Sequence, residues 1–216
     1  MSTFSYFRNG AAVALLSCCT LSLSHAQQLR KVGPFDQLKA SGACDVVLTQ
    51  GPATTVKVVT EGELERYIKT DVQNGTLNIY RDKDAPSSWF NNKKVTVYVT
   101  CPRLRGIETS GASDVKSTST FEADEFTIKA SGASDVVLGL NTRLLTVTAS
   151  GASDIDLKGR ADRQQIRLSG SSDYNATNLQ SQQADVQASG SSDAYVSAVQ
   201  LTSHASGASD IHNRRK

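Results

Sequence analysis

The sequence predicts an all-β chain folded as a parallel β-helix, or β-solenoid, with about 19–21 residues per rung. The main evidence is a five-residue motif, Ser-Gly-(Ala/Ser)-Ser-Asp, which recurs at steps of 21, 19, 19, 20 and 17 residues between successive first serines. Apolar and polar residues also alternate on both sides of each copy, with the two-residue period of β-strands. Short helix-forming runs are missing from the repeats, which argues against leucine-rich or helical repeats.

We call this motif the pentad. An earlier relative, Ser41–Asp45, has Cys44 in place of the fourth residue, serine. The six full copies are Ser110–Asp114, Ser131–Asp135, Ser150–Asp154, Ser169–Asp173, Ser189–Asp193 and Ser206–Asp210.

The alternation continues through each pentad and predicts which of its residues face the core. If Ala149 points inward along an extended strand, Gly151 and Ser153 also point inward, and Asp154 points outward. Glycine and serine would then occupy a bend with little room for a side chain. Rungs stacked at about 4.8 Å would align the aspartates in one outward column. Its members are Asp114, Asp135, Asp154, Asp173, Asp193 and Asp210.

The charge of this column needs to be offset, because neighbouring carboxylates repel by roughly 1 kcal/mol in water. Hydrogen bonds from backbone N–H groups and serine hydroxyls in the turns are one means. A Ca²⁺ ion bound between carboxylates and carbonyls is the other. Calcium-binding β-rolls use a nine-residue period with two glycines per unit, which this chain lacks. Turn bonding is therefore favoured, and no cofactor is expected.

Residues 1–26 have the features of a secretory signal peptide. Arg8 supplies a positive charge, Gly10–Leu23 is mostly apolar, and Ser24 and Ala26 are small residues at the −3 and −1 positions of a cleavage site before Gln27. A lipoprotein signal with Cys18 lipidated is the alternative, but Leu16 fits that pattern poorly. We therefore expect an exported protein, in the periplasm, on the outer membrane surface or outside the cell. No transmembrane segment is expected after cleavage.

The remaining chain divides into an N-terminal β half, residues 27–106, and the repeat half, residues 107–216, within one continuous domain. In the first half, alternation predicts strands near 46–49, 55–60 and 94–100. Asn74 and Gly75 between two alternating runs predict a β-hairpin over 71–80. Residues 61–69 have some helical character, but Gly62 limits them to a loop or a single turn.

Two residue pairs in the first half are candidate functional or stabilising features. Trp89 and Phe90 lie in a polar stretch, where aromatic side chains form a platform for a sugar or a protein or fold back to cap the core. Cys44 and Cys101 are the cysteines that follow the leader. An oxidising compartment permits a disulfide between them, and two buried thiols are the alternative.

Composition and residue types favour a non-catalytic binding module. The formal net charge of +2 does not suggest nucleic-acid binding. Only His204 and His212 follow the leader, and neither has a nucleophile at a suggestive spacing, so a polysaccharide-acting β-helix enzyme is the less favoured alternative. A self-assembling structural envelope protein is a further alternative. The partner of a binding module would be a glycan or a protein at the cell surface.

Several short segments together resemble a known bacterial family. They are Phe35 and Asp36, the run Asp45–Gly51 after the first pentad, Asn74–Leu77, the strand Val95–Tyr98 with Pro102, and the repeated pentads. The family is described as putative auto-transporter adhesin, head GIN domain. The resemblance implies a secreted or envelope protein of largely β-helical fold, and the family name implies adhesion.

Overall fold

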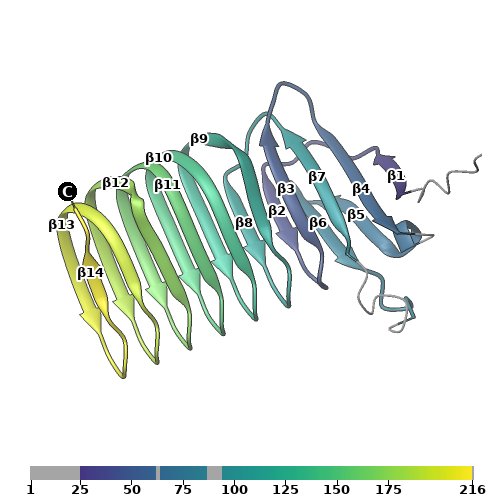
Figure 1. The fold of residues 1–216 in the computed structure, drawn as a ribbon. Helices are drawn as coiled ribbons and strands as arrows, with labels where there is room; N and C mark the ends of the chain where they lie inside the picture. Colours follow the sequence, from purple (N-terminus) through teal and green to yellow (C-terminus); the bar gives the residue numbers. More distant parts are fainter. Residues whose placement is uncertain (1–24, 62–63, 87–93, 216) are drawn as a thin grey trace, which may run out of the picture.

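The computed structural model describes residues 25–61, 64–86 and 94–215, with the side chains of β1 described from Gln28. It confirms the predicted class: the chain forms a β-solenoid of about six turns with ~19 residues per rung. Figure 1 shows the rungs stacked side by side, from the N-terminal strands at one end to β13 and β14 at the other. Among the described residues, no helix combines the length and hydrophobicity that crossing a membrane requires.

Short strands build the N-terminal half, and long curved strands build the repeats. The first set is β1 (His25–Arg30), β2 (Gln37–Ala40), β3 (Asp45–Gln50), β4 (Thr55–Glu61), β5 (Ile68–Gln73), β6 (Thr76–Arg81), β7 (Thr96–Cys101) and β8 (Gly106–Thr109). The second set is β9 (Val115–Ala130), β10 (Asp135–Ala149), β11 (Asp154–Leu168), β12 (Asp173–Ala188), β13 (Ala194–Ala205) and β14 (Ile211–Asn213).

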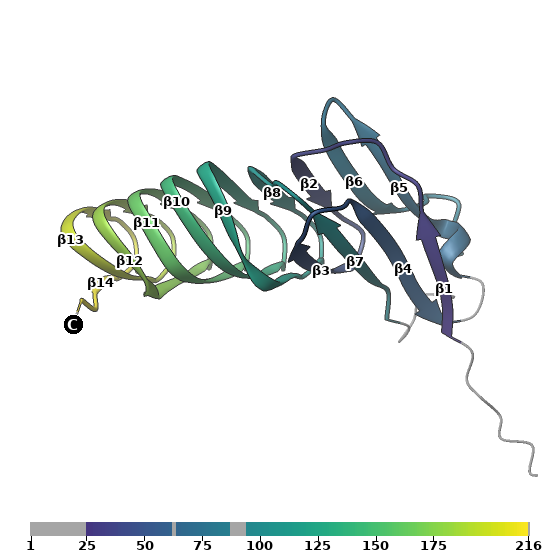
Figure 2. The same cartoon turned by 90° about the horizontal axis from the view of Figure 1, so that it is seen from above.

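All these strands belong to one sheet wrapped around the core. One row runs β1-β4-β7-β3-β9 and continues through β10 to β14, while β5-β6-β2-β8 forms a second row that joins β9 at its other end. The repeat strands pair parallel and nearly in register, so that Asp135 lies opposite Asp154 and Ala149 opposite Leu168. Figure 2 shows the two rows closing around the interior.

The first pentad is part of the same stack, although 69 residues separate Ser41 from Ser110. β2 and β3, joined by Ser41–Asp45, form one rung against β8 and the start of β9. β6 and β7 then stack on the outer side of β2 and β3 as a further parallel layer. The antiparallel strands β4 and β5 lie beyond them. The chain therefore builds the N-terminal end by inserting strands 4 to 7 between two neighbouring rungs.

The expected hairpin and single turn are both present. β5 and β6 pair antiparallel around Asn74 and Gly75, which have φ values of 50° and 75°. Two consecutive residues with positive φ form the hairpin turn that Asn-Gly favours. The segment with helical character is one 3-10 turn, η1 (Leu64–Tyr67).

The unequal pentad steps correspond to local insertions within rungs. β9 has two residues more than β10 where the register shifts between Val137 and Gly139, in agreement with the step of 21. β12 has one residue more than β11 near Asn175, and three more than β13 after Ala176, in agreement with the steps of 20 and 17.

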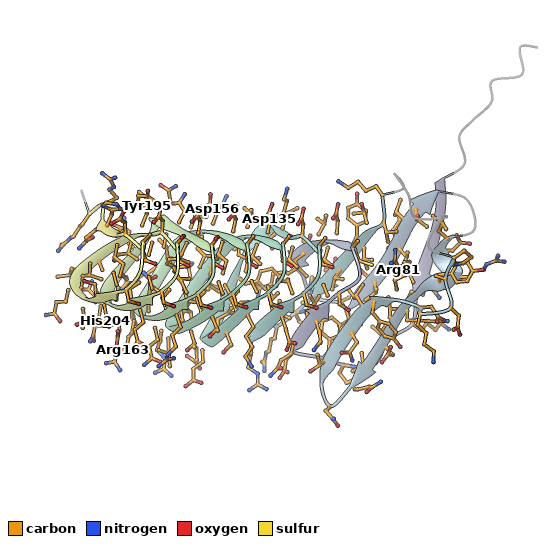
Figure 3. The ribbon with its side chains drawn as sticks, turned by 90° about the horizontal axis from the view of Figure 1, so that it is seen from below. Arg81, Asp135, Asp156, Arg163, Tyr195 and His204 are labelled. Carbon is orange, nitrogen blue, oxygen red and sulfur yellow. The ribbon has the colours of Figure 1, made fainter. Side chains whose placement is uncertain are left out.

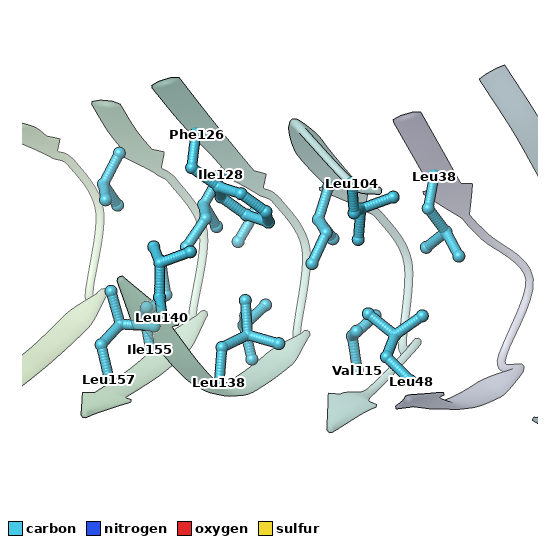
Figure 4. Packing of buried hydrophobic residues seen from close by; sticks show 14 of the residues in the cluster. Leu38, Leu48, Leu104, Val115, Phe126, Ile128, Leu138, Leu140, Ile155 and Leu157 are labelled. Atoms are coloured by element: carbon cyan, nitrogen blue, oxygen red, sulfur yellow. The ribbon is translucent and has the colours of Figure 1, made fainter. Parts of the chain in front are cut away.

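The core is a continuous column of aliphatic and aromatic side chains along the solenoid axis. In Figure 4 one row of side chains, including Phe126 and Ile128, faces a second row that includes Leu138 and Leu140. These four residues are at most 2% exposed. Burying each such side chain contributes about 1.5–3 kcal/mol, so the column holds the rungs together along with their backbone hydrogen bonds.

Candidate functional site

The pentads stack as one column of turns at a single edge of the solenoid (Figure 1). Backbone hydrogen bonds link each turn to the one before it: Ala152 N donates to Gly132 O at 2.7 Å, and Ser150 N donates to Ala130 O at 3.0 Å. The turns therefore continue the parallel ladder through the bend, which makes them part of the scaffold.

The predicted orientation of the pentad glycine is wrong. Ser153 and Ile155 are buried as expected and Asp154 is exposed, but Gly151 is exposed as well. The prediction assumed an extended path, whereas Gly151 has φ +83°, which turns the chain outward at this point. A Cβ there would lie 2.5 Å from Gly132 O of the preceding turn. Glycine is required because the turns lie close to one another, not because the interior is narrow.

Serine hydroxyls, rather than the aspartates, carry most of the side-chain bonding in the turns. The fourth pentad residue donates to the carbonyl of the first within the same turn, as Ser153 Oγ does to Ser150 O at 3.1 Å. The first residue donates to the preceding rung, as Ser131 Oγ does to Thr109 O at 3.2 Å. The expected turn bonding is thus present, but with backbone carbonyls as the acceptors.

The predicted aspartate column exists and is one member longer at its N-terminal end. Asp45 precedes Val46, which pairs with Val115, so Asp45 lies beside Asp114. Asp114 Oδ1 accepts a bond from Asp135 N and Asp193 Oδ1 accepts one from Asp210 N, both at 3.3 Å. Within residues 25–61, 64–86 and 94–215, the side chains of Asp135, Asp154 and Asp173 have no hydrogen-bond or ion-pair partner.

A cation closes the N-terminal end of the column. Lys94 Nζ lies 2.9 Å from Asp45 Oδ2, and this bond together with the charges of Asp45 and Asp114 raises the pKa of Lys94. The remaining carboxylates are exposed to water, which screens their mutual repulsion. In the part of the chain that the structure describes, no group of three or more His, Cys, Asp or Glu side chains is placed to hold a metal ion.

A second outward column runs beside the aspartates and carries aromatic and aliphatic residues. Strand register places Tyr98 beside Val47 at one end and Tyr195 beside His212 at the other. Tyr98 is 45% exposed, and the rings of Tyr195 and His212 stack with centroids 5.1 Å apart. Figure 3 shows Asp135, Asp156 and Tyr195 along one side of the solenoid. We call this side the acidic face.

The opposite side has a different composition. It carries Arg163, Arg167 and His204, all exposed, and Figure 3 shows Arg163 and His204 facing away from Asp135 and Asp156. Within β11, β12 and β13, Arg167 pairs with Gln187 and Gln187 with His204. No hydrogen bond joins His204 to another described side chain. The expected surface position of this histidine is therefore observed.

The two cysteines are buried free thiols, and the disulfide alternative is not what the structure contains. Asp45 pairs with Thr96 and Gln50 with Cys101, so Cys44 and Cys101 lie six residues apart along adjacent strands, roughly 20 Å. A disulfide requires Cα atoms within about 7 Å. Cys44 instead takes the buried position that serine fills in the other turns, beside Ser113. Burial raises the pKa of Cys44 to about 12 and that of Cys101 to about 11.

We therefore expect both thiols to be present and shielded in the folded protein. A thiol reagent at pH 8 should modify neither Cys44 nor Cys101 in the native chain, because both are buried and protonated. Without reductant, unfolding in guanidinium chloride should expose both. Mass spectrometry of the peptides counts the modified sites. An intact mass lower by two protons after denaturation would instead indicate a bridge.

Trp89 and Phe90 lie outside the described residues. The segment that contains them joins β6 to β7, and these strands stack beside β2 and β3. The platform proposed for the two aromatic residues therefore stays a prediction.

Sequence reasoning missed a buried polar chain inside the repeat half. Tyr174 Oη donates to Gln164 Oε1 at 2.6 Å, and Gln164 Nε2 donates to Ser181 Oγ at 2.9 Å. Ser181 Oγ then donates to Ser197 O at 3.2 Å. Tyr174 and Gln164 are fully buried. The signal in the sequence was Gln164 itself, which occupies a position that is apolar or small in the other repeats.

Comparisons with known proteins agree with this architecture. Residues 34–214 match the family model described as "Putative auto-transporter adhesin, head GIN domain". A solved structure of a "putative adhesin" from Bacteroides fragilis NCTC 9343 is 22% identical and superposes with a TM-score of 0.78, covering 89% of this chain and 98% of that one. No curated protein matches the chain.

Two further solved structures come from Parabacteroides, and both are 16% identical to this chain, covering 88% of it. A "putative lipid binding protein" from Parabacteroides distasonis ATCC 8503 is covered over 96% of its length, with a TM-score of 0.64. A "putative adhesin" from Parabacteroides merdae ATCC 43184 is covered over 95%, also with a TM-score of 0.64. At this level of identity, the likeness establishes a shared fold.

Proposed function

Because the chain belongs to the auto-transporter adhesin head GIN domain family, we propose that it is an exported, non-catalytic module that attaches to a glycan or protein partner at a cell surface. The observation that carries this proposal is the repetition of outward side chains along a rigid parallel ladder. Asp135, Asp154 and Asp173 occupy equivalent positions on successive rungs, about 4.8 Å apart. Repeat proteins commonly bind partners through such extended, regular surfaces.

The acidic face is one candidate contact surface for this partner. Its aspartates are held by the scaffold rather than by bonds of their own, so they are available to a ligand, and Tyr98 and Tyr195 add partly exposed rings beside them. Aromatic rings with one polar end suit both sugar and protein contacts. Trp89 and Phe90 are the second candidate, on the segment between β6 and β7.

The names of the solved relatives are in keeping with attachment, since two of those described above are called adhesins and the third a lipid binding protein. Export from the cell follows from the predicted signal peptide, whose cleavage position lies two residues inside β1 (His25–Arg30). A surface partner and an exported module are consistent with each other.

A binding screen tests the proposal. The protein is applied to immobilised surface glycans, acidic and neutral polysaccharides and extracellular-matrix proteins, and saturable binding is measured by surface plasmon resonance. We expect binding to at least one partner, without any change in the partner's mass. Depolymerisation of a bound polysaccharide would contradict the non-catalytic assignment, and a protein that binds none of these partners would contradict the function.

Variants then distinguish the two candidate surfaces. Asp135→Asn with Asp154→Asn and Asp173→Asn removes charge from the acidic face, and Trp89→Ala with Phe90→Ala removes the aromatic pair. Loss of binding in one variant and not in the other assigns the contact. Full binding by both variants would exclude both surfaces.

A further inference from the structure

A hollow of about 480 Å³ lies beside the last rungs of the solenoid, on the edge away from the pentads. Such a volume falls within the range of about 300–1,000 Å³ found for ligand sites. Residues from β11, β12, β13 and the C-terminal tail line it. We call it the C-terminal groove.

The groove arises from the short last repeat. Ala176 pairs with Val196 and Gln180 with Ser197, so residues 177–179 of β12 have no counterparts in β13. Thr177 and Asn178 therefore stand beside a rung that does not fill the space next to them, and both line the groove. The step of 17 residues between the last two pentads is the sequence feature that produces it.

The tail that closes the groove is fixed in place. The side-chain amide of Asn213 donates to Ala198 O at 2.9 Å and accepts from Ala198 N at 3.2 Å, as a neighbouring strand would. Arg214 N donates to Val196 O at 2.7 Å, and its guanidinium lies 5.5 Å from the centre of the Tyr195 ring. These contacts hold Arg214 and Arg215 along the wall of the groove.

The lining has the chemistry of an anion site. Arg160, Arg214 and Arg215 line the groove, and no carboxylate does. Asp162 accepts from Nε and Nη2 of Arg160, both at 3.2 Å, which orients that guanidinium and leaves its remaining N–H groups available. The other lining side chains are mainly amides and hydroxyls, including Asn178, Gln180 and Gln182, whereas Val199 is the one aliphatic residue among them.

We propose that the C-terminal groove binds a segment of an acidic polysaccharide. Arginines bind carboxylate or sulfate groups through charge-assisted hydrogen bonds, and the amides match sugar hydroxyls. Lipid chains would find little apolar surface there. This inference builds on the proposed function as a binding module and assigns a site distinct from the acidic face, whose negative charge would repel the same polymer.

Calorimetric titration with two soluble polymers tests the site: polygalacturonate, which carries carboxylates, and dextran sulfate, which carries sulfates. We expect the protein to bind at least one of them and not neutral dextran. The double variant Arg214→Gln with Arg215→Gln should bind at least about tenfold more weakly, because two charge-assisted contacts are lost. Arg160→Gln alone should weaken binding in the same direction.

The matched control is Arg163→Gln with Arg167→Gln, which removes the same charge from the side opposite the acidic face. Unchanged affinity in this control, to within about twofold, supports the groove. An equal loss in both double variants, or no binding of either polymer by the unaltered protein, would overturn it. Binding to phosphatidylglycerol vesicles but to neither polymer would also overturn it. Binding in the surface screen that persists in the groove variant would exclude this site while leaving the proposed function intact.

Discussion

Gly151→Ala should destabilise the protein more than any other single-methyl addition considered for the pentads. Alanine at φ +83° costs about 1–2 kcal/mol from its backbone conformation alone. Its Cβ would also lie 2.5 Å from Gly132 O and 3.0 Å from Gly132 N, and these backbone atoms cannot move without breaking the ladder at Ala152 N. We therefore expect a loss of about 3 kcal/mol or more, corresponding to a melting temperature roughly 6–12 °C lower.

Gly33→Ala is the matched control, because no atom lies within 4 Å of the added Cβ. It should change stability by less than about 0.5 kcal/mol. Ala152→Ser is a second control at the next pentad position, which is exposed and already serine in two of the six copies. Differential scanning calorimetry gives the three values. If Gly151→Ala melted with the controls, the stacked turns would not be as close as described.

The buried polar chain gives the second large effect. Tyr174→Phe removes the donor to Gln164 Oε1 and leaves that acceptor buried without a partner. Gln164→Met leaves the Tyr174 hydroxyl unpaired in the core. Each change should cost about 1–3 kcal/mol, since an unsatisfied buried group loses its solvation without compensation. Guanidinium chloride unfolding measures both.

The double variant distinguishes a hydrogen-bonded pair from simple packing. With both partners replaced by apolar groups, no unsatisfied atom of this pair remains, so the combined loss should be smaller than the sum of the single losses by about 1 kcal/mol or more. Tyr195→Phe is the control for the loss of a phenol oxygen, because Tyr195 is only partly buried and lies outside this chain. Additive losses at Tyr174 and Gln164 would contradict the pairing.

The repeat architecture could be predicted because it depends on local information. The pentad fixes where each turn falls, and the alternation fixes which strand residues are buried, as with Ile155 and Leu157. The glycine orientation could not be obtained this way, because parity holds only on an extended path and Gly151 leaves it. Positive φ was foreseeable from the residue type but not from the periodicity.

Features that depend on contacts between distant residues were beyond the sequence pattern. The placement of β6 and β7 beside β2 and β3 joins segments about 40–50 residues apart, and nothing local specifies their pairing. The state of Cys44 and Cys101 followed from that same register. For the groove, the shortened step was visible, but the position of the missing residues and the path of Arg214 and Arg215 required the strand pairing.

The central claim is that the pentads superpose rung upon rung. Nitroxide labels on cysteines replacing Asp114 and, in turn, Asp154, Asp173, Asp193 or Asp210 test it through double electron–electron resonance, with Cys44 and Cys101 left in place because they are buried. We expect the label distance to rise by about 4.8 Å with each further rung, reaching about 24 Å for the Asp114 and Asp210 pair. Distances that do not increase steadily along this series would show that the turns are not stacked in one column.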